Sequence, residues 1–200
     1  MMHAPYRYDY VGSFLRPAEL KSARKDFEEG KITAEQLKEV EDRCITDLVS
    51  KQKAAGYHFI TDGEFRRTWW HMDFFWGLNG IEKVSTKDGL HFHGETTRAE
   101  SAAITGKISG TGHPFVEHFK FVKQFEEEGV YVKQTIPAPT QLLAQLRLPE
   151  FAEQNNAIYR DQEELKNDIV KAYGEVIQEL YDAGCRNLQL DDCTWTLYAD

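Results

Sequence analysis

Long apolar runs and an excess of positive charge are both missing from this chain of 200 residues. No stretch of about 18 apolar residues could cross a bilayer as a helix, and the opening residues MMHAPYRYDYVGS lack the apolar segment of a secretory signal. Lysine and arginine are dispersed and the formal net charge is -9, so no basic surface for nucleic acid or anionic lipid is indicated. We therefore expect a cytoplasmic protein with no nucleic-acid and no membrane partner.

Cysteine is also scarce, with Cys44, Cys185 and Cys193 widely separated and no CxxC pair. This spacing argues against a disulfide framework and a cysteine-ligated zinc cluster within the chain, so we expect reduced thiols. Cys193 has no paired base in the sequence, which favours a buried, inert thiol over a nucleophile. The rest of the composition, 41% hydrophobic and 28% charged, fits an ordinary globular protein.

Strands and helices are expected to alternate along the chain. The hydrophobic patterns predict strands at residues 6–14, 57–63, 106–110, 130–140 and 185–193. They predict helices at residues 16–30, from Thr33 to near Gly56, at 114–128 and at 158–182. Thr33 and Gln36 form a capping-box pattern. Residues 81–105 are predicted to be polar and irregular, apart from a hairpin-like arm in LHFHGETTR.

This alternation predicts a parallel α/β fold with crossover helices. Polar or reactive residues follow the predicted strands, namely Gly12-Ser13, Asp62-Gly63-Glu64, His113, Pro137 to Thr140 and Asp191-Asp192. In parallel α/β folds and TIM barrels the ligand site lies at the C-terminal strand ends, so one shared site is expected. A full (β/α)₈ barrel takes about 250 residues, so five strands predict either an open sheet or the front part of a barrel.

The stretch FITDGEFRRTWWHMDFFWGLNG crowds charges against aromatic rings. If strand geometry continues through Gly63, Asp62 and Glu64 face the same way and could bind an ammonium group or a metal. The alternative is that these carboxylates cap the following helix and pair with Arg66 or Arg67. The rings form either a pocket wall or a core patch, and composition leaves both open.

Three weaker motifs each have a structural alternative. The VGSF turn offers backbone N–H groups to a carboxylate or phosphate, although Gly-Ser turns are common. His91 and His93 could present two imidazoles to zinc, but no third ligand is near, and a surface hairpin is the alternative. The pair Asp191-Asp192 after NLQL either lines the substrate rim or caps the next helix.

Taken in order, the motifs VGSFLRP, FITDGEFRRTWWHMDFFWGL, HPFVEHFKF, KQTIPAPTQL and NLQLDDCTW resemble the cobalamin-independent methionine synthase superfamily. The resemblance runs from about Tyr6 to Trp195 and is nearest to the short, single-barrel bacterial branch, which corresponds to the catalytic C-terminal half of the full synthase. It implies a TIM (β/α)₈ barrel, of which this chain would hold about the first five strands. Residues 1–200 would then be one domain, truncated at its C-terminus.

The same resemblance implies methyl transfer to the thiol of homocysteine or a related thiol, a step of methionine biosynthesis. The implied site residues are Val11, Gly12 and Ser13 for the amino-acid carboxylate, Glu64 and Asp191 as the catalytic pair on its ammonium group, and Trp69 with Trp70 and Phe74 as the wall. The chemistry agrees, because backbone N–H groups suit an anion and strand-end carboxylates suit a cation.

Zinc is the cofactor that the resemblance implies, and it would activate the thiol. The family's zinc ligands, a His-x-Cys pair with a later Glu and Cys, lie downstream of the strand matching LQLDD. We therefore expect no metal ligands in this chain, no zinc bound by it alone and no zinc-dependent turnover from it alone. A second departure is Tyr10, because the short branch commonly has His at this position.

The partners implied are a thiol amino acid and a methyl donor, which is folate, methylcobalamin or another small molecule. One competing function is a Mg²⁺-dependent TIM-barrel lyase or isomerase with Asp62, Glu64 and Asp191 as ligands. It leaves VGSF and IPAPT unexplained. Another is a non-catalytic amino-acid-binding fragment. A truncated barrel would expose the edge of its last strand, so a homo-oligomer is also open.

Overall fold

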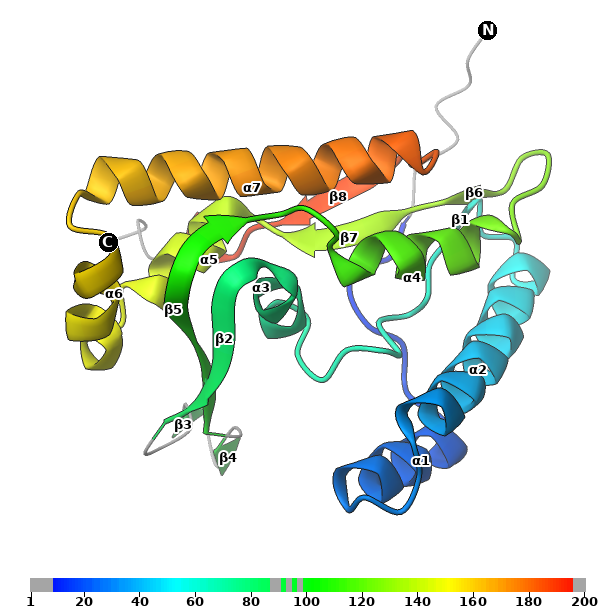
Figure 1. Cartoon of the computed structure of the whole chain (residues 1–200). Coiled ribbons are helices and arrows are strands. Elements are labelled where there is room, and N and C mark those ends of the chain that lie inside the picture. The colour runs from blue at the N-terminus through cyan, green and yellow to red at the C-terminus, as the bar shows by residue number, and fades with distance from the viewer. Residues whose placement is uncertain (1–8, 87–90, 93–94, 97–98, 196–200) are drawn as a thin grey trace, which may run out of the picture. The chain divides into compact units, whose positions relative to one another are not determined.

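The computed structural model describes residues 9–86, 91–92, 95–96 and 99–195 (Figure 1). Its contacts divide the chain into two compact units. The first unit comprises residues 1–70, 118–135 and 184–189, and the second comprises 71–117, 136–183 and 190–200. Each unit is therefore assembled from segments that are far apart in the sequence.

The first unit contains a helical hairpin and a short parallel strand pair. Its elements are α1 (Ala18–Glu28), α2 (Ala34–Ala54), β1 (Phe59–Ile60) and β6 (Tyr131–Val132), and it also receives the end of α4 (Pro114–Lys123). α1 packs on α2, and β1 pairs in parallel with β6. The predicted capping box is confirmed, because Thr33 Oγ1 accepts from Gln36 N and Gln36 Oε1 accepts from Thr33 N.

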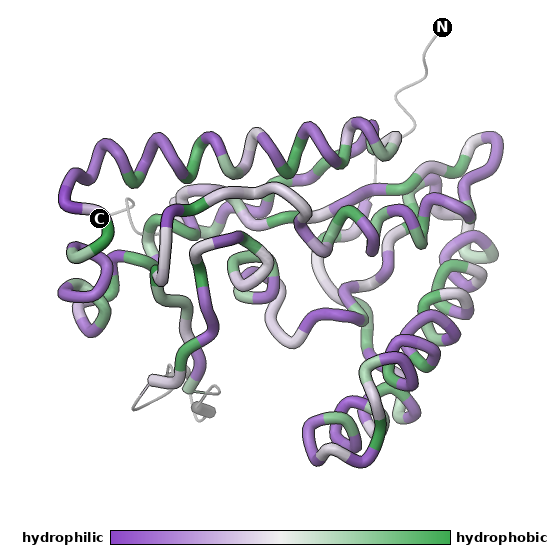
Figure 2. Tube along the Cα trace, viewed as in Figure 1, coloured by the Kyte–Doolittle hydropathy of each residue, from purple (hydrophilic) through white to green (hydrophobic). Residues whose placement is uncertain are grey.

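The second unit is built on an antiparallel strand pair. β2 (Asn79–Ser85) pairs with β5 (Glu100–Ser109), and five helical segments accompany them: α3 (Met72–Gly77), α5 (Pro139–Leu146), the 3-10 turn η1 (Pro149–Phe151), α6 (Ala152–Ile158) and α7 (Gln162–Asp182). α6 and α7 pack on β5. Figure 2 shows hydrophobic and hydrophilic residues alternating along α7, and the apolar stripe from Leu165 to Leu180 is buried.

The prediction that residues 81–105 are irregular was wrong, because this region supplies most of the β2–β5 pair. β2 is mostly polar, and its one fully buried residue, Ile81, lies opposite Ile104 of β5. A single buried apolar residue is too short a pattern to stand out in the sequence. The hairpin-like arm was confirmed as β3 (His91–Phe92) and β4 (Glu95–Thr96), which pair in antiparallel fashion. His93 lies outside the described residues.

β7 (Gln134–Pro137) and β8 (Leu188–Asp191) form the strand pair that ends in the predicted site motifs. Gln134 N donates to Asn187 O over 3.0 Å, and Ala138 N donates to Asp191 O over 2.8 Å. The bonds advance in the same direction along both strands, as parallel pairing requires. β8 is shorter than predicted and less buried, with Leu190 46% exposed.

The α/β class predicted from the sequence is confirmed. In the part of the chain that the structure covers, the strands form four two-stranded sheets and no closed barrel. The predicted strand at residues 6–14 was wrong over residues 9–14, which are held by side chains rather than by a strand ladder. Among the described helices, none is both long and apolar enough to cross a membrane.

Candidate functional site in the turn after the first strand

Glu64 lies in a turn that follows β1, in the first unit. Gly63 has a φ of 65° and Glu64 a φ of 60°, and Glu64 is the one non-glycine residue with positive φ in the described ranges. A residue with a Cβ atom rarely adopts this left-handed region, so the backbone at Glu64 is strained. β1 ends at Ile60, so the prediction that Asp62 and Glu64 share a strand face was wrong.

Asp62 closes this turn rather than joining Glu64. Its Oδ1 accepts from the backbone N–H of Glu64 over 2.8 Å, and Thr61 Oγ1 accepts from Gly63 N over 3.1 Å. These short-range bonds compensate for the strained backbone. Of the two alternatives for Asp62, the structural one fits the geometry.

The carboxylate of Glu64 is buried beside a buried arginine. Glu64 is 4% exposed and Arg67 is 2% exposed, and Arg67 Nη1 lies 3.4 Å from Glu64 Oε1. Arg67 Nη2 also donates to Thr135 O over 2.7 Å and to Thr135 Oγ1 over 3.0 Å. Glu64 is therefore a buried carboxylate that Arg67 holds in a fixed position, where charge interactions are stronger than in water.

Arg66 has a different partner set and is not part of this pair. It forms ion pairs with Glu41 and Asp42 of α2, and its guanidinium lies 5.0 Å from the ring centroid of Phe121. Burial raises the pKa of Glu41, while Arg24 and Arg66 oppose that rise. Arg66 therefore ties the turn to α2 rather than to Asp62 or Glu64. Of the two arginines named in the ion-pairing alternative, Arg67 is the one that pairs with Glu64.

The VGS segment packs against this turn. Phe14 N donates to Gly63 O over 3.1 Å, so two of the predicted site segments are brought together in one unit. Gly12 has a φ of 80° and Val11 is 73% exposed. Among the described residues, the N–H groups of Val11, Gly12 and Ser13 have no hydrogen-bond partner. They are available to an anion such as a carboxylate.

Tyr10, which stands where the short branch commonly has His, points inward. Its hydroxyl donates to Phe59 O over 2.9 Å and also contacts Gln52 Oε1. Its ring meets those of Phe14 and Tyr57 edge-on, with centroids 4.9 Å and 4.8 Å away. Burial raises the pKa of Tyr10, so the phenol stays protonated. It serves to anchor the VGS segment.

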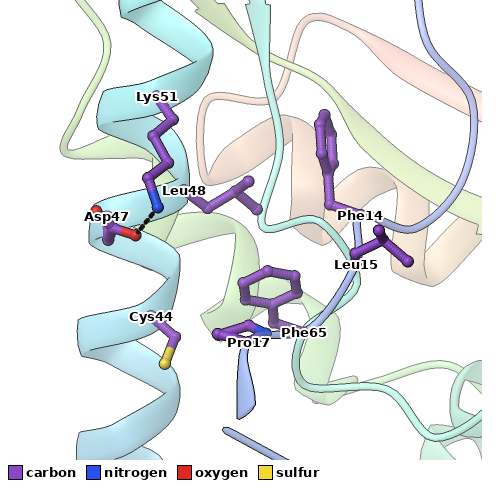
Figure 3. Close-up of a pocket in the computed structure, with 8 residues that line it drawn as sticks. All are labelled: Phe14, Leu15, Pro17, Cys44, Asp47, Leu48, Lys51 and Phe65. Carbon is purple, nitrogen blue, oxygen red and sulfur yellow. Dashed lines mark hydrogen bonds and ion pairs between the residues drawn. The ribbon is translucent and has the colours of Figure 1, made fainter. Parts of the chain in front are cut away.

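A small apolar pocket of about 250 Å³ lies behind the turn, on the side of α2 (Figure 3). It is lined by Phe14, Leu15, Pro17, Cys44, Asp47, Leu48, Lys51 and Phe65, and Asp47 and Lys51 form an ion pair at 2.6 Å. None of the predicted site residues lines it. The sequence did not indicate this pocket, because its walls combine one helix face with two separate loop segments.

Asp191 is at the end of β8 and belongs to the second unit, whereas Glu64 belongs to the first. Asp191 is half-buried, and its carbonyl accepts from Ala138 N. Asp192 Oδ1 accepts from Thr194 N over 2.9 Å and from Thr194 Oγ1 over 2.5 Å, and these bonds lower the pKa of Asp192. Asp192 therefore closes a local turn. The pairing of Glu64 with Asp191 stays a prediction.

Two other sequence-based predictions need correction or refinement in the second unit. Cys193 is exposed rather than buried, and its Sγ contacts Gln141 Oε1 at 3.1 Å, since β8 ends two residues earlier. His113 is buried with Nε2 2.9 Å from Phe74 O, while its Nδ1 accepts from Phe115 N. The imidazole of His113 therefore has a structural role, because both of its ring nitrogens contact backbone groups.

The aromatic segment divides between core and half-buried positions. Phe74 and Phe75 are fully buried, and Phe74 packs against the rings of His113 and Tyr173. For these rings the core-patch alternative is correct, and Phe74 is not a site wall. Trp69 and Trp70 are half-buried in the first unit, where Trp70 O accepts from Arg67 Nη1 over 3.2 Å. Their role as a wall stays a prediction.

The described residues offer no group of three or more His, Cys, Asp and Glu side chains that could hold a metal ion. The donor set that zinc requires, commonly four nitrogen, sulfur or oxygen ligands, is therefore not assembled by these residues. His91 is in β3, and its HxH partner His93 is outside the described ranges.

The fold and the turn together define an α/β protein with a buried, preorganised carboxylate at a strand end. A family model described as the catalytic domain of cobalamin-independent synthase matches residues 9–197, and the chain belongs to this family. This confirms the resemblance that the five motifs carried. Relatives named methionine synthase support a methyltransferase-like kind of protein.

The chain spans about half the length of the curated relatives it matches. It is 44% identical over 196 residues to the uncharacterized protein YxjH of Bacillus subtilis, covering 98% of this chain and 50% of the relative. It is 26% identical over 189 residues to the methionine synthase of Sulfurisphaera tokodaii, covering 91% of this chain and 50% of that protein.

Solved structures agree with this fold. A crystal structure from Listeria monocytogenes, provisionally assigned as a vitamin-B12-independent methionine synthase, matches with a TM-score of 0.78 at 40% identity. The match covers 98% of this chain and 55% of that one. A B12-independent methionine synthase from Shewanella, solved with selenomethionine, has a TM-score of 0.64 at 22% identity over 84% of this chain and 46% of that one, and shows the fold alone.

Proposed function

We propose that this chain carries the amino-acid-binding part of a thiol methyltransferase of the methionine synthase type, acting on homocysteine or a related thiol. The observation that carries the proposal is Glu64, a buried carboxylate held in a left-handed turn against Arg67. Strained, desolvated ionisable groups concentrate at functional sites. Family membership supplies the reaction class.

In this proposal the substrate is held at two ends. The N–H groups of Val11, Gly12 and Ser13 bind the amino-acid carboxylate, and Glu64 binds the ammonium group. The family resemblance implies the same ammonium-binding role for Asp191. Trp69 excludes water from the transferred methyl group. The contact between Phe14 and Gly63 supports the first part, because it joins the anion-binding segment to the Glu64 turn.

The proposal extends to the fold and to the cofactor. The parallel pairs β1–β6 and β7–β8 are consistent with part of a TIM barrel. Zinc would activate the thiol when bound, and the described residues do not fit a zinc site, so we propose that its ligands are supplied outside them. We expect the chain alone to bind an amino acid but not to transfer a methyl group. We propose a cytoplasmic location. The methyl donor is folate, methylcobalamin or another small molecule.

Thermal protection tests this proposal against the Mg²⁺-dependent alternative. A ligand that binds the native state raises the melting temperature, by mass action. We expect L-homocysteine and L-methionine to raise the melting temperature of the chain, and Mg²⁺ to leave it unchanged. Protection by Mg²⁺ without protection by either amino acid would favour the lyase or isomerase. The geometry already weighs against that function, because Asp62 is committed to the Glu64 amide.

A further inference from the structure

Residues 9–16 contain no helix or strand, and their N-terminal end is anchored by a buried lysine. Lys133 Nζ donates to Asp9 Oδ2 over 2.7 Å and to Tyr10 O over 2.6 Å, and it lies 5.0 Å from the centroid of the Tyr10 ring. The side chain of Lys133 is 5% exposed, whereas that of Asp9 is 34% exposed. Lys133 is the first residue of the KQTIPAPT motif, and its backbone N–H donates to Ile60 O at the end of β1.

The other end of the segment is anchored by an arginine. Arg16 Nη2 donates to Glu64 O over 2.9 Å and to Arg67 O over 2.7 Å. These carbonyls flank the turn that carries the buried carboxylate. The segment is thus fixed beside β1 at one end and to the Glu64 turn at the other, by two cationic side chains that are far apart in the sequence.

Between the two anchors lie the three residues whose N–H groups have no partner in the described structure, Val11 to Ser13. A loop without a ladder would otherwise lose conformational entropy on binding an anion. Lys133 cannot readily serve as the anion ligand itself, because its charge is paired with Asp9 and a second donor is used by Tyr10 O. Lys133 can therefore affect ligand binding only by holding residues 9–16 in place.

We propose that Lys133 and Arg16 are positioning residues that hold the Val11–Ser13 N–H groups in register with Glu64, and so set specificity for ligands with a free α-carboxylate. This inference rests on the proposed function and deepens it. Lys133 fixes the carboxylate-binding end, Arg16 couples that end to the ammonium-binding turn, and neither residue contacts the substrate.

Calorimetric titration of the whole chain with three ligands tests the inference. L-Homocysteine carries both end groups, homocysteamine lacks only the carboxylate, and mercaptobutyrate lacks only the amine. Lys133→Met and Arg16→Met should weaken L-homocysteine and mercaptobutyrate binding by about tenfold and leave homocysteamine binding unchanged. Asp9→Asn weakens the same ion pair by changing its more exposed partner. It should also weaken the binding of L-homocysteine and mercaptobutyrate. The control Lys53→Met removes a half-exposed ion pair with Glu127 in the same unit and should change none of them.

The outcomes separate the inference from the proposed function. A wild-type chain that binds L-homocysteine, with variants that lose all three ligands equally or lose none, overturns the inference and leaves the function standing. A wild-type chain that does not bind L-homocysteine overturns the function and the inference with it. Faster hydrogen exchange at the amides of residues 10–16 in Lys133→Met and not in Lys53→Met supports the anchoring independently. Unchanged exchange there contradicts it.

Discussion

Arg67 donates to Glu64 across 3.4 Å in a place where both side chains are almost fully buried. The pair holds a carboxylate in a turn whose backbone is itself strained at Glu64. A buried ion pair contributes little net stability, because desolvation offsets its attraction. Its consequence here is geometric, since the arginine also binds Thr135 and fixes the carboxylate relative to the start of β7.

Removing the arginine should therefore destabilise the first unit strongly. Arg67→Met leaves the Glu64 carboxylate buried without a counter-charge and should lower the free energy of unfolding by about 3–5 kcal/mol. Lys51→Met breaks an exposed ion pair in α2 and should cost under about 1 kcal/mol. Urea unfolding of both variants measures the difference, and equal, small losses would show that the pair is not structurally important.

Gly63 should not tolerate a side chain. A Cβ at this residue would lie 2.3 Å from Leu48 Cδ2 and 3.3 Å from a ring atom of Phe65, in addition to the positive φ of 65°. Gly129 has a φ of 81° and nothing within 4 Å of the same position, so it isolates the conformational cost. We expect Gly129→Ala to cost about 1–2 kcal/mol and Gly63→Ala about 1–3 kcal/mol more. Similar losses for the two variants would argue that Leu48 moves aside freely.

Stability should depend on pH through His71. Burial lowers the pKa of His71 to about 4, below its ordinary value of 6.5. As the pH falls from 6.5 toward 4, the unfolded state takes up the proton first, so the free energy of unfolding falls by up to about 1.4 kcal/mol per pH unit. His71→Phe should remove this slope between pH 6.5 and 5. The conservative core variant Ile81→Val keeps the imidazole and should retain it, as urea unfolding at each pH would show. A His71→Phe variant with the wild-type slope would mean that another group is responsible.

Zinc should not bind tightly to this chain. The described residues contain no group of three or more His, Cys, Asp and Glu side chains that could hold a metal ion. Atomic absorption after extensive dialysis should find well under one zinc per chain. One tightly bound zinc per chain would sink this prediction, and its loss in His91→Ala would then assign it to the HxH motif.

Local signals in the sequence were sufficient for several elements. The capping box of Thr33 and Gln36 depends on residues three apart, and it was predicted together with the helix it begins. The long helix ending before Gly184 was predicted from its apolar stripe, although it starts at Gln162 rather than Ile158. The sequence also predicted strands near these site residues: Glu64 lies in the turn after β1, and Asp191 is the last residue of β8.

Features set by distant partners could not be predicted in this way. Arg67 carries a charge and appears beside an aromatic stretch, yet it is buried because Thr135, 68 residues away, accepts its hydrogen bonds. The left-handed conformation of Glu64 has no local signal beyond Gly63 before it. The N-terminal anchor of residues 9–16 depends on Lys133, which is distant in the sequence. The stretch YRYDYVGSF could therefore not show that side chains, and not a strand ladder, hold this segment.

Titration with L-homocysteine of the wild-type chain and of Glu64→Gln tests the central claim most directly. Glutamine keeps the volume and an oxygen that can accept from Arg67, so the fold should persist, although at lower stability because Arg67 stays buried without its counter-charge. Near-UV circular dichroism would verify the fold. Losing the carboxylate charge should weaken binding by at least about tenfold, since hydrogen bonds to charged groups contribute roughly 1.5–3 kcal/mol. The exposed control Glu39→Gln in α2 should bind like the wild type. A folded Glu64→Gln chain with wild-type affinity, or a chain that unfolds on this change, would contradict the account.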